Sequence, residues 1–257
     1  MEILHDQVYA TQPKPLQKQI ETLLSQSTQN PIDEDILALI VPDTNLLRVG
    51  PSSAKIFKTL AGQDYETVIL VSPSHMGSFG RMTICDLKAY QTPLGSIDIN
   101  TSVCHELCDE DDDIYLEDTG HFHARGIEVQ LPFLQNMLDG FDVVPIVMGV
   151  ESPDFCRELG AAIGAIMFNR RTLLVASADI LSADEESLGL FTEAMETGDV
   201  NALFPLLYSN DVDILGKGAL LVALIASTRR RAKQFRILSM SSPENGTPGH
   251  VGAVISR

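Results

Sequence analysis

The sequence predicts a single α/β domain, with a central mixed, mostly parallel sheet and helices on both of its faces. Short apolar runs bounded by turn residues alternate along the chain with segments of helical spacing, and this alternation is typical of such a fold. Neither a linker nor a repeat of fixed period interrupts the chain. One domain is therefore expected to span residues 1–257.

Six apolar runs rich in β-branched residues are expected to be strands buried on both faces. They cover residues 36–42, 67–74, 143–149, 172–179, 235–242 and 250–256. Apolar residues between these runs recur at intervals of three and four, which favours helices. The helical segments lie around residues 16–24, 56–60, 127–138, 155–166 and 220–224.

The charge of the chain argues against nucleic acid and membrane surfaces as partners. The formal net charge is −17, and such a chain repels phosphate backbones and anionic lipid at long range. Two basic clusters, at residues 170–171 and 229–231, are too short to reverse that balance. The start of the sequence lacks the features of a signal peptide, and the longest apolar stretch, residues 219–226, is far shorter than the ~20 residues of a membrane span. A cytoplasmic location is expected.

Polar residues follow three of the predicted strands, where an open α/β sheet places its ligands. Asp43, His75 and Asp179 each come near the end of such a run, with Ser74 and Ser177 beside them. If the strands are neighbours, two carboxylates and an imidazole converge in a set that can hold Fe(II) or another divalent ion. The alternative is that each Asp caps a helix and that His75 is hydrogen-bonded locally.

Several segments resemble one known family, and they appear in its order over almost the whole chain. They are "SPSHMG", "AYQTPLGSIDI", "GIEVQLPFLQ", "VVPIVMG", "LLVASAD" and "GHVGAV". The sequence thereby resembles the Memo family, also called AmmeMemoRadiSam system protein B. The resemblance implies a fold like that of the class III extradiol dioxygenases and partners of the radical-SAM and AMMECR types.

The sequence departs from this family at the metal pocket that the resemblance implies. Of three expected ligands, His75 is retained, a histidine is replaced by Asp43, and a cysteine aligns with Leu215. Arg125 stands where the family has a histidine, and Ser182 replaces another. A leucine offers no lone pair, so the sequence predicts a degenerate pocket without a bound metal. Its expected lining residues are Asp43, Ser74, His75, Glu128, Asp179 and Ser182.

Two functions follow as hypotheses. The first is a binding or interaction module without oxidative catalysis, in which His75 remains as a hydrogen-bonding group with Asp43 as a possible partner. The second is a divergent non-haem iron-dependent or copper-dependent oxidoreductase whose site is rebuilt from Asp43, His75 and Asp179. A hydrolase that uses Ser177 or Ser182 with His75 is a third possibility, although neither serine has an oxyanion-hole motif. No cofactor is expected under the first hypothesis.

Overall fold

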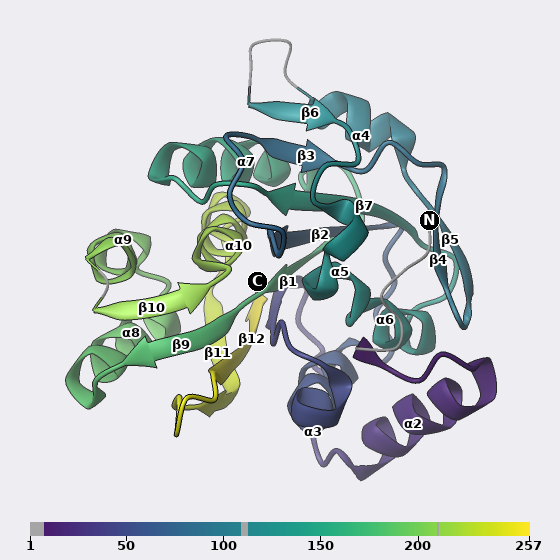
Figure 1. The fold of residues 1–257 in the computed structure, drawn as a ribbon, viewed down its shortest axis with the longest axis horizontal. Coiled ribbons are helices and arrows are strands. Elements are labelled where there is room, and N and C mark those ends of the chain that lie inside the picture. The colour runs from purple at the N-terminus through teal and green to yellow at the C-terminus, as the bar shows by residue number, and fades with distance from the viewer. Residues whose placement is uncertain (1–7, 109–112, 210) are drawn as a thin grey trace.

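The computed structural model describes residues 8–108, 113–209 and 211–257. Its main sheet has ten strands in the order β10-β9-β12-β1-β8-β2-β7-β3-β6, with β11 paired to β12 (Figure 1). These strands are β1 (Ile36–Val41), β2 (Thr67–Pro73), β3 (Met82–Ile84), β6 (Ile114–Leu116), β7 (Asp142–Met148), β8 (Thr172–Ser177), β9 (Asp179–Ala183), β10 (Val212–Leu215), β11 (Gln234–Ser241) and β12 (Gly249–Ser256). A separate hairpin pairs β4 (Ala89–Thr92) with β5 (Gly95–Asp98).

The centre of the sheet is parallel, in the order β1-β8-β2-β7, and antiparallel strands flank it. Every residue of β1, β2 and β8 is buried, because these runs carry apolar side chains on both faces of the sheet. The predicted α/β class with a mixed sheet is thus confirmed. The parallel arrangement brings the carboxyl ends of β1, β8 and β2 to one edge of the sheet.

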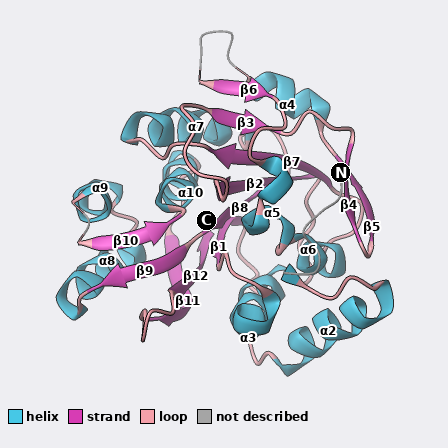
Figure 2. Ribbon diagram, viewed as in Figure 1, coloured by secondary structure: helices cyan, strands magenta, loops and turns pink. Residues whose placement is uncertain are grey.

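Helices cover both faces of the sheet (Figures 1 and 2). On one side α7 packs against α10, and on the other α3, α5 and α6 lie together with α2. The helices are α2 (Pro13–Gln26), α3 (Leu46–Phe57), α4 (Thr101–Leu107), α5 (Arg125–Glu128), α6 (Leu131–Met137), α7 (Pro153–Ile166), α8 (Glu185–Thr197), α9 (Val200–Tyr208) and α10 (Lys217–Arg229). No helix in the described part of the chain is long and apolar enough to cross a membrane.

Three predicted elements differ from the structure. The run at 172–179 is two strands, because β8 ends at Ser177 and the chain turns into β9 at Asp179. The run at 235–242 is not buried on both faces, since β11 pairs only with β12 and most of its residues are half-buried. The helix expected over 127–138 is divided into α5 and α6, and Pro132 lies in the first turn of α6, where a missing N–H is tolerated.

Candidate functional site

The side chains that follow the central strands meet at the carboxyl edge of the sheet. Asp43 lies two residues beyond β1, His75 lies two residues beyond β2, and Ser177 ends β8. Asp179 is the first residue of β9 and lies opposite His250 in the antiparallel ladder between β9 and β12. Adjacent parallel strands deliver their following residues to one place, so the topology itself gathers these groups.

Asp43 is the centre of this cluster. Its side chain is fully buried, and Oδ1 lies 2.5 Å from Nε2 of His75. The hydroxyl of Ser177 donates to Oδ2 at 2.9 Å. Arg125 donates from Nε to the backbone carbonyl of Asp43 at 3.2 Å, and its Nη2 lies 3.5 Å from Oδ1. Both carboxylate oxygens therefore have partners from the protein.

Asp179 supports Asp43 from the start of β9, which is separated from β1 by β12 in the sheet. Its Oδ1 accepts a hydrogen bond from the backbone N–H of Asp43 at 3.1 Å. Burial, and then the charge of Asp43, raise the pKa of Asp179 to about 7. In the β9–β10 ladder Asp179 lies opposite Leu215, so this leucine belongs to the same edge of the sheet as the cluster.

Gly126 allows the cluster to close. A Cβ atom at this position would lie 2.2 Å from Oδ2 of Asp43, 2.3 Å from the hydroxyl oxygen of Ser177 and 2.5 Å from that of Ser72. No side chain fits at such distances, so α5 approaches Asp43 through a glycine. The backbone of α5 thereby covers the buried carboxylate.

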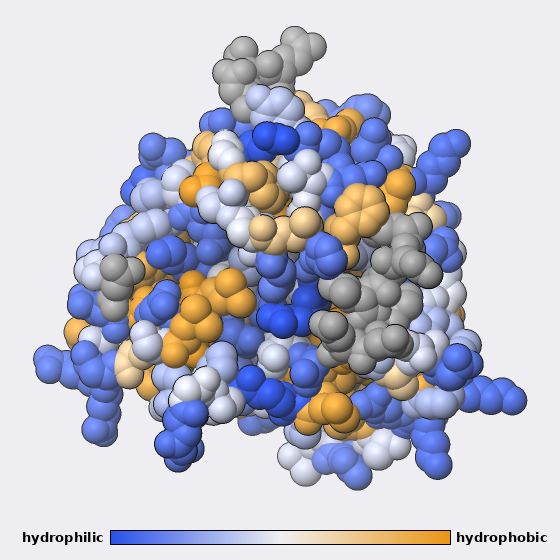
Figure 3. Space-filling model, viewed as in Figure 1, coloured by the Kyte–Doolittle hydropathy of each residue, from blue (hydrophilic) through white to orange (hydrophobic). Residues whose placement is uncertain are grey.

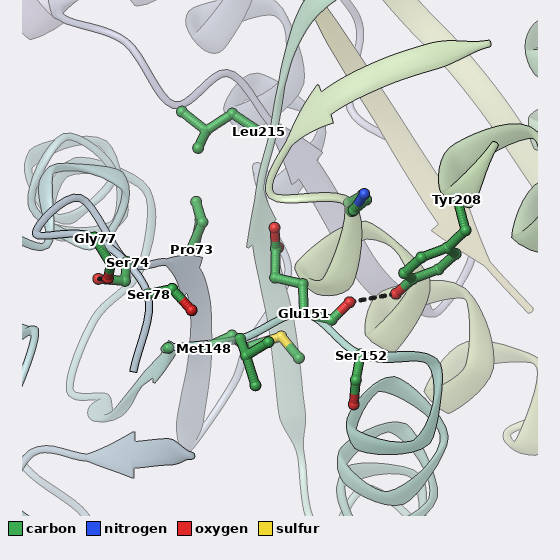
Figure 4. Close-up of a pocket in the computed structure, with 12 residues that line it drawn as sticks. Pro73, Ser74, Gly77, Ser78, Met148, Glu151, Ser152, Tyr208 and Leu215 are labelled. Carbon is green, nitrogen blue, oxygen red and sulfur yellow. Dashed lines mark hydrogen bonds between the residues drawn. The ribbon is translucent and has the colours of Figure 1, made fainter. Parts of the chain in front are cut away.

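A pocket of about 480 Å³ opens beside the cluster, between the ends of β2 and β7 and the start of α10. Ser74, Glu151, Tyr208, Leu215 and Lys217 are among its lining residues, and Figure 4 shows Leu215 and Glu151 around the same space. The Tyr208 hydroxyl donates to the carbonyl of Glu151 at 2.5 Å. The pocket thus combines an apolar wall with hydroxyl, carboxyl and ammonium groups. On the face shown in Figure 3, hydrophilic residues at the centre border a small apolar patch.

Sequence reasoning did not identify Glu151 as a pocket residue. Its Oε1 accepts the backbone N–H of Gly218 at 2.9 Å, at the start of α10. Burial raises the pKa of Glu151 to about 7, although this helix terminus and Lys217 act in the opposite direction. The signal was present in the sequence, because Glu151 follows the apolar run of β7 just as Asp43 follows that of β1.

The other expected lining residues lie in different surroundings. Ser74 lines the pocket, and its hydroxyl donates to the carbonyl of Gly77 at 2.7 Å. Glu128 is buried on α5, where it accepts a hydrogen bond from Tyr9 at 3.1 Å, and burial raises its pKa to about 7. Ser182 is exposed on β9, opposite Asp213. The structure therefore brings together Asp43, His75 and Asp179 from the expected set.

These three side chains do not fit a metal ion as ligands. A cation beside Oδ1 of Asp43 would meet the guanidinium of Arg125 and would have to displace the ring of His75. Oδ2 accepts from Ser177, and Leu215 supplies no donor atom. Within residues 8–108, 113–209 and 211–257, no group of three or more His, Cys, Asp or Glu side chains has a metal-binding arrangement.

Ser177 and His75 also do not form the hydrogen bond from hydroxyl to imidazole that a catalytic serine–histidine pair requires. The hydroxyl of Ser177 donates to Asp43, so it is not directed at the ring of His75. Both Ser177 and His75 bind the same carboxylate, whereas a nucleophilic serine needs the imidazole as its base. Nδ1 of His75 is buried without a hydrogen-bond partner among the described residues.

Comparison with known proteins agrees with this architecture. A structure of an uncharacterised protein from Escherichia coli K12 matches with a TM-score of 0.58 and 16% identity, over 86% of this chain and 100% of that one, and so shares the fold. A MEMO1 family protein of Saccharolobus solfataricus is 27% identical, over 93% of this chain and 91% of its own length. Another, of Nitrosopumilus maritimus, is 26% identical over 82% of this chain and 78% of its own. The model of the family described as Memo-like protein matches residues 5–254. The chain therefore belongs to the Memo-like protein family.

Proposed function

We propose that this protein is a Memo-family member with a degenerate metal pocket, which acts as a binding module and not as a metal-dependent oxidoreductase. One observation carries the proposal: the buried carboxylate of Asp43 is held by His75, Ser177 and Arg125. The positive group that neutralises Asp43 is an arginine of the chain itself, at the place where the family has a histidine.

The pocket beside Leu215 is the proposed binding site. Its volume of about 480 Å³ is within the range of small-molecule sites, which are usually apolar with a few placed polar groups. Leu215 and Met148 offer apolar contacts, while Glu151 and Lys217 offer a carboxyl group and an ammonium group. Such a lining suits a small organic molecule that has an apolar body and polar substituents.

A pocket-filling variant tests this role. We expect ligand-observed NMR with a library of small polar organic fragments to yield binders to the wild-type protein, and Leu215→Trp to abolish their binding by filling the pocket. Leu181→Trp is the matched control, because Leu181 is 40% exposed on β9 and is not a lining residue of the pocket. Fragment binding that survives Leu215→Trp, or that is lost equally in both variants, contradicts the proposed site.

The alternative oxidoreductase requires Asp43, His75 and Asp179 to rearrange around an ion. Support for it is limited to the convergence of these three side chains at one edge. It predicts that Fe(II) or Cu(II) binds with one equivalent and that His75→Ala abolishes that binding. Failure of both ions to bind removes the alternative.

The protein partners expected from the family resemblance are part of the same proposal. Radical-SAM and AMMECR-type proteins are the expected partners, in a cytoplasmic setting. Co-expression with such proteins from the same genome, followed by size-exclusion chromatography, tests this directly. Separate elution of every pair contradicts it.

A further inference from the structure

The two basic clusters of the sequence meet at the edge of the sheet opposite the Asp43 cluster. Arg170 and Arg171 precede β8, Arg230 follows α10, and Arg257 follows β12. All four line one pocket of about 370 Å³, at the amino ends of the parallel strands. A chain with a net charge of −17 thus gathers four of its cationic side chains in one small space, together with Asp35 and Asp64.

Three of these arginines have carboxylate partners. Arg170 pairs with Glu106 at 2.7 Å, and Arg257 pairs with Asp35 at 2.5 Å. Arg171 pairs with both Asp64 and Glu66. These side chains are partly exposed, so their contacts are ordinary surface ion pairs, and their charges are balanced by the protein itself.

Arg230 is different, because it is only 9% exposed and forms no direct ion pair with a carboxylate in the described part of the chain. Its guanidinium carbon lies 4.6 Å from the ring centre of Phe168, and this is the contact that the structure records for its side chain. Its Nε is buried without a hydrogen-bond partner among the described residues. Burial and the charge of Arg257 lower the pKa of Arg230, whereas the carboxylate of Asp35 acts in the opposite direction. A buried N–H group without an acceptor is costly, so this side chain needs an explanation.

The carbonyl groups at the end of α10 supply part of the compensation. The C-terminus of a helix carries a partial negative charge, which favours a cation there. This contribution leaves Nε of the guanidinium without an acceptor. An oxyanion in the pocket would supply both the charge and the acceptors.

We propose that this arginine pocket binds the phosphate group of a small molecule, with Arg230 as its anchoring residue. The planar fork of an arginine matches two oxygens of a phosphate. Arg170, Arg171 and Arg257 line the same pocket as further donors, although their carboxylate partners Asp35 and Asp64, which also line it, offset part of their charge. The volume of the pocket fits a small metabolite, and the net negative charge of the chain disfavours a polyanion such as nucleic acid. Phe168, which is 69% exposed, holds the guanidinium in place from one side.

Arginine side-chain NMR tests the proposal on the intact protein. Inorganic phosphate and pyrophosphate are titrated at constant ionic strength, and the Nε–H resonance of Arg230 is identified by its loss in Arg230→Gln. We expect this resonance to shift and saturate. Because charge-assisted hydrogen bonds are worth about 1.5–3 kcal/mol, Arg230→Gln is expected to weaken phosphate binding by about tenfold or more.

Arg229→Gln is the matched control, since Arg229 is the exposed neighbour that does not line the pocket. Its phosphate affinity should equal that of the wild type. Phosphate should also raise the Tm of the wild type and of Arg229→Gln, but not that of Arg230→Gln. If the Arg230 resonance does not move at tens of millimolar phosphate, or if malonate binds and phosphate does not, the proposal is wrong. If Arg230→Gln does not fold, triple-resonance assignment of the wild-type protein identifies the Arg230 Nε–H resonance, and the wild-type titration still decides the proposal.

Discussion

Nε2 of His75 lies 2.5 Å from Oδ1 of Asp43, and Asp43 is fully buried. The contact joins the end of β2 to the end of β1 across the intervening strand β8, whose Ser177 binds the other oxygen of the same carboxylate. The expected pairing of His75 with Asp43 is therefore present. The carboxylate of Asp43 thus holds a histidine, a serine and an arginine together.

Replacing Asp43 is expected to destabilise the fold. Asp43→Ala removes the acceptor of Ser177 and His75 and leaves these polar groups without it. The free energy of unfolding should fall by about 2–4 kcal/mol. Loss of the ion pair with Arg125 should contribute little to this change, because the Arg125 side chain is partly exposed. Urea denaturation measures the change. Asp154→Ala is the control, because Asp154 forms an exposed pair with Arg157, and it should remain close to the wild type.

Gly126→Ala is expected to disrupt the same cluster by steric conflict. The added Cβ would lie 2.2 Å from Oδ2 of Asp43, so α5 must move away or the carboxylate must turn. We expect a loss of about 1–3 kcal/mol, as is typical of overpacked sites. Gly189→Ala is the matched control, since nothing lies within 4 Å of its added Cβ in α8 and alanine favours a helix. Equal stabilities of the two variants would contradict the close approach of α5 to Asp43.

The buried carboxyl groups are expected to make the protein less stable as the pH rises from about 4 to about 7. Burial raises the pKa of Asp179, Glu128 and Glu151 to about 7, whereas such groups ionise near pH 4 in an unfolded chain. Between these values the folded state binds more protons than the unfolded state. By linkage, the contribution of these groups is fully present below pH 4 and is lost as the pH rises to about 7.

Asp179→Asn isolates one of these groups. The amide oxygen can still accept the hydrogen bond from the backbone of Asp43, but it does not titrate. The stability of this variant relative to the wild type should therefore increase between pH 4 and pH 7, by about 1–3 kcal/mol. Urea denaturation at pH 5 and at pH 7.5 measures the difference. A difference that is constant with pH indicates that Asp179 is ionised in the folded protein throughout this range.

The sequence was sufficient for the central strands because their signal is local. The runs that form β1, β2 and β8 are apolar on both faces and end in polar residues, so both the parallel core and the place of Asp43 and His75 could be predicted. Short strands such as β3 and β10 carry too few residues for a pattern, and they depend on the neighbours with which they pair.

The contacts within the site could not be predicted in the same way. Arg125 lies 82 residues from Asp43, and its role depends on how α5 crosses the end of the sheet through Gly126. The family resemblance marked Arg125 as a substitution but not as the partner of Asp43. Glu128 and Ser182 were expected in the pocket, but their surroundings depend on the break between α5 and α6 and on the way β9 leaves the cluster. Long-range packing decides these positions.

Metal content is the most direct test of the account. The double variant Asp43→His/Leu215→Cys restores the ligand types expected from the family. This variant and the wild-type protein are incubated anaerobically with Fe(II) or Cu(I) and then desalted. Elemental mass spectrometry measures the metal that each protein retains. The account predicts that the double variant retains far more metal than the wild type. One equivalent of iron or copper on the wild-type protein, released by His75→Ala, would contradict the central claim that Asp43 and His75 are partners of each other and not ligands of an ion.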